Sequence, residues 1–297
     1  YIQDKIETEG MVVNVGLRLD FFNPGNEVAN LRESQPVLGI PFWKSKTEYR
    51  LSPRLGVSYP VTEYDKFYFN YGHFSETPEF QYFYEDTTQF GGALRLYGNP
   101  NLHAEKTIAY EFGVHHAFND VLSLKIAGFF KDIRGLIDTE KRGVPPITYQ
   151  IRVNKDYGSV RGIEAVFSKA YSNYYSFLLS YTLSWAMGNS SSDRQGYDYD
   201  YRGIPLPLRE YPLDWDERHR ITFSFDVNVP PGEHPVAFGW KLWDYWGFNV
   251  LMEYGSGLPF TPTDSLAGEI IKAVSYTHLR AHETRRDLVC RLLLEKK

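Results

Sequence analysis

Two groups of ionisable side chains stand close enough in the sequence to suggest metal or acid–base chemistry. One consists of Asp214, Asp216, Glu217, Arg218 and His219. Catalysis would also need an ordered nucleophile, base and orienting group, and no such set accompanies these residues. The other group is His115 and His116, which on a strand would point to opposite faces and could not easily share a metal. We therefore predict no enzymatic activity, no metal site and no cofactor.

A third group, His278, His282, Glu283 and Cys290, lies in a stretch of different composition. From Val274 the chain becomes rich in Arg and Leu, and Tyr276 is the one aromatic residue of this stretch. Residues 274–297 resemble, in one reading frame, the translation of a sequencing-library adapter. We therefore expect a non-native artefact tail at 274–297 and assign the genuine protein to residues 1–273.

The composition of the genuine part excludes several classes of protein. It has 26 basic and 34 acidic residues, without the clustered basic charge of a nucleic-acid-binding protein. No run of about 18 apolar residues occurs, so we expect no membrane-spanning helix. With 23 Tyr, 20 Phe and 6 Trp in the whole chain, much apolar surface must be buried, which argues against disorder.

Apolar and polar residues alternate with a period of two over unusually long segments. In residues 11–22, Met11, Val13, Val15, Leu17, Leu19 and Phe21 share one face, and Asn14, Gly16, Arg18 and Asp20 share the other. Alternation of this kind predicts a strand between an apolar and a polar environment. It recurs in residues 50–59, 107–118, 122–131, 175–185, 221–229 and 246–254, and more weakly in 66–74 and in a kinked segment, 147–170.

Short and long connections between these strands alternate along the chain. The short ones fall at residues 7–10, 61–65, 119–120 and 171–173, and the long ones at 23–48, 75–106, 135–146 and 188–217. The link 230–242 is short by position but longer than the others of its class. Alternating lengths are typical of an antiparallel up-and-down barrel, with short turns at one end and long loops at the other.

The length and polarity of the strands favour a membrane over a protein core. Strands of about a dozen residues can cross a bilayer, which needs roughly 9–11 tilted residues. Their polar faces carry Arg, Lys, Glu and Asp, which suit a hydrated lumen better than a dry interior. Because open sheet edges do not survive in hydrocarbon, we predict an all-β transmembrane barrel, incomplete, with about ten strands of a larger ring.

Five phrases, in order, resemble the β-barrel of TonB-dependent outer-membrane receptors. They are YGNPNLHAEKTIAYEFGVHHAFND (97–120), LKIAGFFKDIRGLID (124–138), NKDYGSVRGIEAVFSKA (154–170), DWDERHRITFSF (214–225) and YGSGLPFTPTD (254–264). The resemblance implies a ring of 22 strands, an N-terminal plug and energy delivered through TonB. This chain has no plug, TonB-contacting segment, signal peptide or closing strand, so we expect a fragment. In the family, the charged group at Asp214 marks strand entry, where charges pair at the rim.

The candidate ligand-binding residues are lumen-facing charges and aromatic residues of a long loop. The charges are Arg18, Arg54, Glu111, Lys125 and Glu164, and the aromatic residues are Phe80, Tyr82, Phe83 and Tyr84. Rings that stack, combined with hydrogen-bonding groups, could capture a siderophore, a corrinoid or an oligosaccharide. The alternative is that the charges pair only with each other or with the plug.

We therefore expect a bacterial outer-membrane receptor for active uptake of a scarce nutrient. Its partners would be outer-membrane lipid, the TonB complex through the missing plug, and a small-molecule or oligosaccharide ligand, with no nucleic acid. The alternatives are a passive porin-like channel, a barrel enzyme such as a lipase or protease, and a secreted β-sandwich binding module. A sandwich would pack the apolar faces against a second protein layer.

Overall fold

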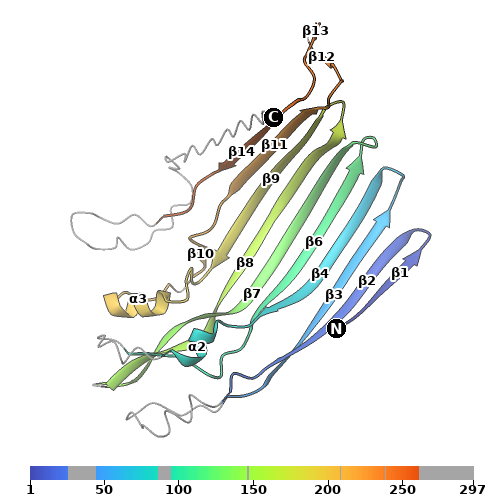
Figure 1. Cartoon of the computed structure of the whole chain (residues 1–297). Coiled ribbons are helices and arrows are strands. Elements are labelled where there is room, and N and C mark those ends of the chain that lie inside the picture. The colour runs from blue at the N-terminus through green and yellow to red at the C-terminus, as the bar shows by residue number, and fades with distance from the viewer. Residues whose placement is uncertain (26–44, 86–94, 146, 208, 238, 261–297) are drawn as a thin grey trace, which may run out of the picture.

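One curved antiparallel sheet makes up most of the protein (Figure 1). The computed structural model describes residues 1–25, 45–85, 95–145, 147–207, 209–237 and 239–260. The sheet has 12 strands, and its main path runs β1-β2-β3-β4-β6-β7-β8-β9-β11-β14. Because neighbours in this path also follow one another along the chain, the topology is up-and-down, as predicted.

The path strands are β1 (Ile2–Thr8), β2 (Met11–Phe22), β3 (Glu48–Pro60), β4 (Asp65–Glu76), β6 (Glu105–Ala117), β7 (Leu122–Val144), β8 (Ile147–Ser172), β9 (Tyr175–Gly188), β11 (His219–Val229) and β14 (Trp246–Gly255). Two-residue strands lie beside or beyond them: β5 (Leu96–Tyr97), β10 (Tyr211–Pro212), β12 (Val236–Ala237) and β13 (Trp240–Lys241). The helices are α2 (Phe80–Tyr84) and α3 (Gln195–Arg202). Among the described residues, no helix is both long and apolar enough to cross a bilayer.

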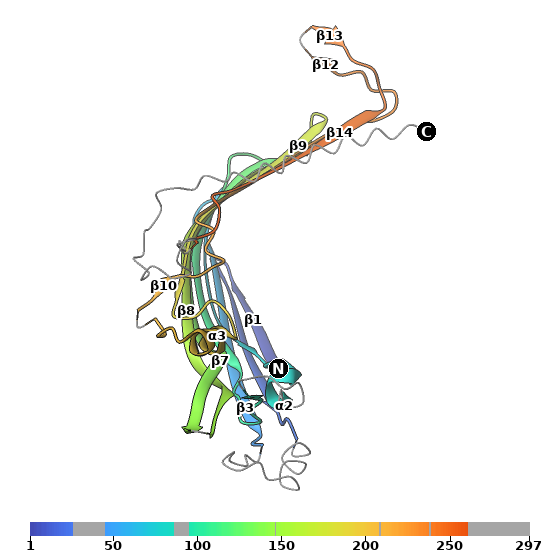
Figure 2. The ribbon, with the colours of Figure 1, turned by 90° about the vertical axis from the view of Figure 1, so that its left-hand side faces the viewer.

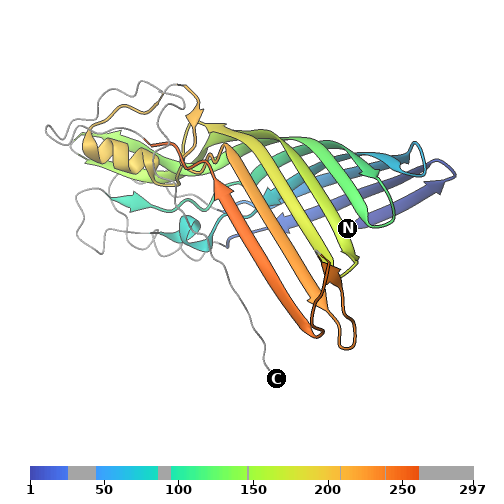
Figure 3. The same ribbon diagram turned by 90° about the horizontal axis from the view of Figure 1, so that it is seen from above.

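The sheet curves without closing, as the view from above shows (Figure 3). Within the described chain, β1 pairs only with β2, and β14 pairs only with β11. Helices α2 and α3 lie at the long-loop end, and the small β12-β13 hairpin lies at the opposite end (Figure 2). The structure is therefore part of a barrel wall, as the strand count predicted.

Apolar side chains line up in continuous rows on the outer, convex face. One row passes in register through Val13, Val57, Phe69, Phe112 and Gly128 to Ile163. Another pairs Phe167 with Leu179, and Leu179 with Phe223. Phe112 is 55% exposed and Leu19 is 60% exposed, so no described protein layer covers these rows. This arrangement contradicts the β-sandwich alternative and leaves a belt of apolar surface for lipid. Asp4, opposite Val15, is a departure from the belt on β1.

The predicted loop at residues 135–146 is wrong. Strand β7 continues to Val144 and pairs with β8 as far as Ile147. A bulge follows Arg134, where Gly135 has a φ of 74°, a left-handed conformation that glycine adopts without strain. Because the bulge shifts the side-chain alternation, the period-two pattern breaks there and the extension looks like a loop in the sequence. The kinked segment 147–170 is β8, and the long link 230–242 contains β12 and β13.

Residues 274–297 lie outside the described part of the chain. The expectation that they form a foreign tail stays a prediction.

A charge placed in the apolar belt should destabilise the barrel much more than the same charge on the inner face. Leu179 faces outward in the middle of β9, and its neighbour Ser180 faces inward, opposite Val166 and Thr222. In the full-length receptor refolded into lipid vesicles, Leu179→Arg should lower the free energy of unfolding by about 2–4 kcal/mol. Ser180→Arg should change it by less than about 1 kcal/mol, as measured by denaturant titration. Equal losses in the two variants would contradict the assignment of faces.

Candidate functional site

The inner face of the sheet carries the five charged residues predicted to face a lumen. Arg18, Arg54, Glu111, Lys125 and Glu164 all alternate with outward-facing apolar residues, so all five lie on this face. They come from five different strands, β2, β3, β6, β7 and β8. The structure brings two of them, Glu111 and Lys125, into contact and leaves the others spread across the wall.

Glu111 and Lys125 meet around the ring of Tyr68. The Tyr68 hydroxyl donates to Glu111 Oε1 over 3.0 Å, and Lys125 Nζ lies 3.4 Å from the same oxygen. Lys125 Nζ also sits 5.1 Å from the centre of the Tyr68 ring. Gly113, opposite Tyr68 on β6, makes room for the ring, because a Cβ there would lie 2.4 Å from the Tyr68 side chain. Sequence reasoning missed Tyr68 as part of this group.

The remaining charges of the inner wall differ in how far they are neutralised. Arg18 forms an ion pair with Asp20, with 2.8 Å between Nη2 and Oδ1. The Arg54 guanidinium lies over the Phe74 ring at 4.8 Å and has no carboxylate partner within the described chain. Glu164, between Ala127 and Thr182, likewise forms no ion pair with any described residue. Among the described residues, Arg18, Glu111 and Lys125 are therefore paired within the wall, and Arg54 and Glu164 have no ionic partner. Pairing of these two charges with a plug stays an open alternative.

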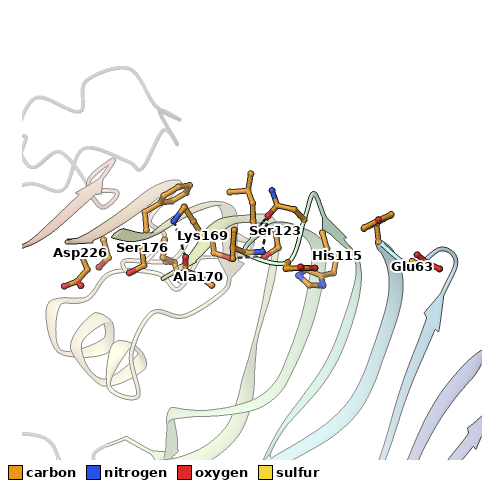
Figure 4. A pocket seen from close by; sticks show the side chains of 17 residues that line it. Glu63, His115, Ser123, Lys169, Ala170, Ser176 and Asp226 are labelled. Atoms are coloured by element: carbon orange, nitrogen blue, oxygen red, sulfur yellow. Dashed lines mark hydrogen bonds between the residues drawn. The ribbon is translucent and has the colours of Figure 1, made fainter. Parts of the chain in front are cut away.

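A hollow of about 590 Å3 lies at the short-turn end of the wall (Figure 4). It is lined by Ser123, Ser168, Ser176 and Asp226 from four neighbouring strands, and by His115. His116, next in sequence, turns to the other face, where its Nδ1 lies 2.6 Å from Asp65 Oδ1. The two histidines therefore diverge, as predicted. Hydroxyl groups, the carboxylates of Glu63, Asp120 and Asp226, and apolar side chains such as Phe177 together give this hollow a mixed surface.

The four predicted loop aromatics form helix α2, which packs against the inner side of the sheet. Phe22, an inward-facing residue of β2, contacts Phe80 and Phe83, with ring centres 6.1 and 5.3 Å apart. Phe83 is fully buried with Leu102 and Ile137, so its ring supports the loop and is not accessible to a ligand. The exposed aromatic surface belongs to Phe80, which is 67% exposed. This corrects the prediction of ligand stacking for Phe83.

Tyr82 and Tyr84 also take part in packing at this end. The Tyr84 hydroxyl donates to the carbonyl oxygen of Pro24. Tyr82 is half-buried, and burial raises the pKa of its hydroxyl to about 12, with a further contribution from a hydrogen bond to Asp193. Both rings contact the Phe83 cluster, so α2 is held in a defined position above the wall.

A buried arginine, Arg152, joins α2 to the loop before α3. Its side chain is 1% exposed and forms ion pairs of 3.1 Å with both Glu85 and Asp193. Its guanidinium also lies 4.6 Å from the centre of the Tyr82 ring. The sequence carried no signal for this residue, because its partners are 67 and 41 positions away.

A second polar cluster docks α3 onto the extended β7-β8 hairpin. The Gly196 amide donates to both oxygens of Asp138, which is 1% exposed, and Lys155 Nζ lies 3.0 Å from Asp138 Oδ2. Asn189 donates to Asp156 Oδ1 over 2.8 Å. Asp156 lies beyond the last apolar row of the belt, and burial, helped by the nearby charge of Asp138, raises its pKa to about 6.

The charged group at residues 214–219 pairs at the rim, as predicted. Asp216 is buried, accepts from the Ala186 amide over 2.8 Å and lies 2.7 Å from Arg218 Nη2. The Arg218 guanidinium stacks over Trp185 at 5.1 Å. His219 contacts the Tyr181 hydroxyl at 3.0 Å. These contacts attach the long loop to the start of β11 and need no catalytic explanation.

Comparison with known proteins adds the family. Residues 1–280 match the family described as TonB dependent receptor-like, beta-barrel. The chain belongs to this family. Its members are transporters of the bacterial outer membrane, so the protein lies in that membrane and is not an enzyme. Long loops of outer-membrane barrels are extracellular and short turns periplasmic, which places α2 and α3 outside the cell.

Three solved structures share the fold. The ferric-catecholate import receptor Fiu from E. coli K12 superposes with a TM-score of 0.53 at 16% identity, covering 90% of this chain and 35% of that one. The siderophore receptor PirA from Pseudomonas aeruginosa gives 0.50 at 16% identity, covering 85% and 36%. The FrpB iron transporter from Neisseria meningitidis (F5-1 variant) gives 0.50 at 14% identity, covering 84% and 32%. This chain therefore spans about a third of the length of these receptors.

Removing Arg152 should release α2 from the wall. Arg152→Ala in the full-length receptor leaves Glu85 and Tyr82 without their buried partner, and we expect a loss of about 3–5 kcal/mol in the local stability of residues 80–85. Arg194, which is exposed and also contacts Glu85 at 3.2 Å, is the matched control. Arg194→Ala should cost about 0–1 kcal/mol. Hydrogen exchange of residues 80–85 measures both effects, and equal protection in the two variants would contradict the role of Arg152.

The docking of α3 should weaken as the pH rises. The folded pKa of Asp156, about 6, exceeds its ordinary value, so the folded state holds a proton that the open state loses. Stability from this group is complete below about pH 4 and is lost between about pH 4 and pH 6, with no further change above. Hydrogen exchange of residues 186–196, corrected for intrinsic rates, should show this loss. Asp156→Asn keeps the acceptor for Asn189 and should remove the pH dependence; an unchanged profile in the variant would contradict the assignment.

Proposed function

We propose that this chain is part of the wall of an outer-membrane receptor for active, TonB-energised uptake of a scarce nutrient. The nutrient would be a siderophore, a corrinoid or an oligosaccharide. The observation that carries the proposal is that two features lie on the same side of the sheet. One is the charged inner wall, and the other is the set of aromatic residues of α2 (Phe80, Tyr82, Phe83 and Tyr84), which we call the extracellular cluster. Membership of a family of TonB-dependent receptors supports energised uptake.

The inner wall offers contacts that suit a polar ligand with ionised or hydroxyl groups. Arg54 and Glu164 have no ionic partner among the described residues, so a ligand can bind them without breaking an ion pair. Guanidinium and carboxylate groups form charge-assisted hydrogen bonds, which are stronger than neutral ones. Arg18, Glu111 and Lys125 already have partners, and they would contribute through exchange of those partners.

The extracellular cluster supplies the apolar part of recognition. Phe80 presents an exposed ring at the top of the inner wall, and Tyr82 lies beside it, half-buried against Arg152. Because Phe83 and Arg152 hold α2 in place, these rings are ordered before a ligand arrives, which lowers the entropic cost of binding. A ligand would first bind these rings at the extracellular end and would then contact Arg54 and Glu164 on its way into the lumen.

Uptake and binding by the full-length receptor in living cells test the proposal. The receptor would be expressed in a host that lacks its own uptake systems for labelled ferric siderophores, cyanocobalamin and maltodextrins. We expect uptake of one of these classes, with a loss of tenfold or more when TonB is deleted, while binding to the cell surface persists. Uptake that is indifferent to TonB would instead establish a passive channel.

Within the same assay, Arg54→Gln should weaken surface binding of the accepted ligand by about tenfold, because one charge-assisted hydrogen bond is lost. Arg142→Gln is the control, since Arg142 pairs with Glu140 near the tip of the β7-β8 hairpin and lies away from the inner wall. Equal affinity in the two variants would remove Arg54 from the binding site.

A further inference from the structure

Two exposed arginines of the inner wall, Arg18 on β2 and Arg54 on β3, are diagonal neighbours. Arg54 lies directly opposite Gly16, and Arg18 lies directly opposite Ser52, two residues further along each strand. Diagonal positions on adjacent strands are about 7–8 Å apart, which two long side chains can span. The two guanidinium groups can therefore contact one anionic ligand in the lumen.

Arg18 is already bound to a carboxylate of its own strand. Asp20 Oδ1 accepts a hydrogen bond from Arg18 Nε over 2.9 Å and lies 2.8 Å from Arg18 Nη2. The Arg18 side chain is 57% exposed, and an ion pair that is open to water contributes little stability. Asp20 therefore competes with an external anion for Arg18, and breaking the pair costs little free energy.

A third arginine, Arg50, offers Asp20 a second partner. Arg50 lies directly opposite Asp20 on β3, where Cβ atoms are about 5 Å apart. Arg50 Nη2 donates to Thr77 Oγ1 over 3.0 Å, whereas Arg50 Nε and Nη1 are buried and have no hydrogen-bond partner within the described chain. Buried N–H groups without an acceptor cost free energy. A shift of the Asp20 carboxylate from Arg18 to Arg50 would supply that acceptor.

The other carboxylates at this level of the inner wall do not reach Arg50. Glu48, at the start of β3, accepts from the Ala104 amide over 3.0 and 3.2 Å. Glu76 lies opposite Glu105 on β6 and forms no ion pair with any described residue. Asp20 is therefore the carboxylate that the strand register places beside Arg50.

We propose that Arg18 and Arg54 bind a carboxylate group of the transported nutrient, and that Asp20 moves from Arg18 to Arg50 when this group binds. Arginine forms charge-assisted hydrogen bonds with carboxylates, so the bound anion replaces Asp20 on Arg18. The new contact between Asp20 and Arg50 offsets the lost ion pair. Arg50 is a positioning residue, which acts through Asp20 and does not touch the ligand. The inference rests on the proposed function and narrows its substrate class to acidic nutrients.

Carboxylate binding to the purified full-length receptor in detergent tests the exchange. The probe is tricarballylate, which has three carboxylates, and its uncharged triamide is the matched control; isothermal titration calorimetry measures the binding of both. We expect tricarballylate to bind at least about tenfold more tightly than the triamide. Asp20→Asn should tighten the binding of tricarballylate by about fivefold, because Arg18 then has no competing carboxylate.

A double-mutant cycle separates the exchange from simple attraction between charges. In the otherwise unchanged receptor, Arg50→Gln should weaken tricarballylate binding by about tenfold, because Asp20 then has no second partner. In the Asp20→Asn background the same change should alter binding by less than about twofold, since no carboxylate is left to move. Equal weakening in the two backgrounds would overturn the proposal. So would unchanged or weaker binding in Asp20→Asn, or equal binding of the triamide.

Lys131→Gln is the control variant for loss of a positive charge. Lys131 is exposed, faces the lumen and lies in the same row of the sheet as Arg54, three strands or about 14 Å away. Its replacement should alter tricarballylate binding by less than about twofold, because salt screens charges at that distance. A loss equal to that of Arg50→Gln would overturn the proposal. Heat-modified migration on gels checks that every variant forms a barrel.

The binding measurement is separate from uptake, so the two proposals can fail independently. Uptake that is indifferent to TonB contradicts the proposed function and leaves the result of the cycle unchanged. Equal effects of Arg50→Gln in both backgrounds, in a receptor with TonB-dependent uptake, overturn the exchange alone.

Discussion

Hydrocarbon offers no hydrogen-bond partner to the peptide backbone, and the architecture of this protein follows from that constraint. Every N–H and C=O group at membrane depth must bond to a neighbouring strand, so the chain forms one continuous ladder. Each strand of the main path has a hydrogen-bonded neighbour on both sides, except β1 and β14, the two ends of the described arc. A receptor built on this wall therefore needs further strands to close the ring.

The same ladder forces successive side chains into different solvents, and this explains where charge is tolerated. Outward positions hold rows such as Val57, Phe69 and Phe112, while inward positions hold Tyr68, Glu111 and Lys125. Charged side chains on an inner wall that contacts water keep most of their hydration, so their desolvation cost is small. Ion-pair partners such as Asp20 for Arg18 reduce this cost further. Function is thereby confined to the inner face and to the two rims, where the lipid no longer dictates side-chain type.

Outside the membrane, the long loops are ordered without a large hydrophobic core. Small apolar clusters around Phe83 and Tyr97 are supplemented by buried ionic contacts of Arg152 and Asp138. Breaking one of these contacts would leave a buried charge without a partner, so other arrangements of the loops are disfavoured. The contacts therefore select one arrangement of the loops and add little net stability. The ordered aromatic rings at the extracellular end and the charges along the inner wall both lie outside the apolar belt, where lipid does not restrict the side-chain type.

The sequence by itself determined the strands, their alternating faces, the lengths of most connections and the membrane environment. A strand between an apolar and a polar environment needs side chains that alternate with a period of two, and this alternation is visible in the sequence. It also placed Arg54, Glu111 and Lys125 on the polar face for the same reason. Only the tertiary structure decided that β7 continues past Gly135, that Phe83 is buried, and that Arg152 unites segments far apart in the chain. Bulges, loop packing and long-range ion pairs depend on register and on contacts between distant residues, and no local pattern records them.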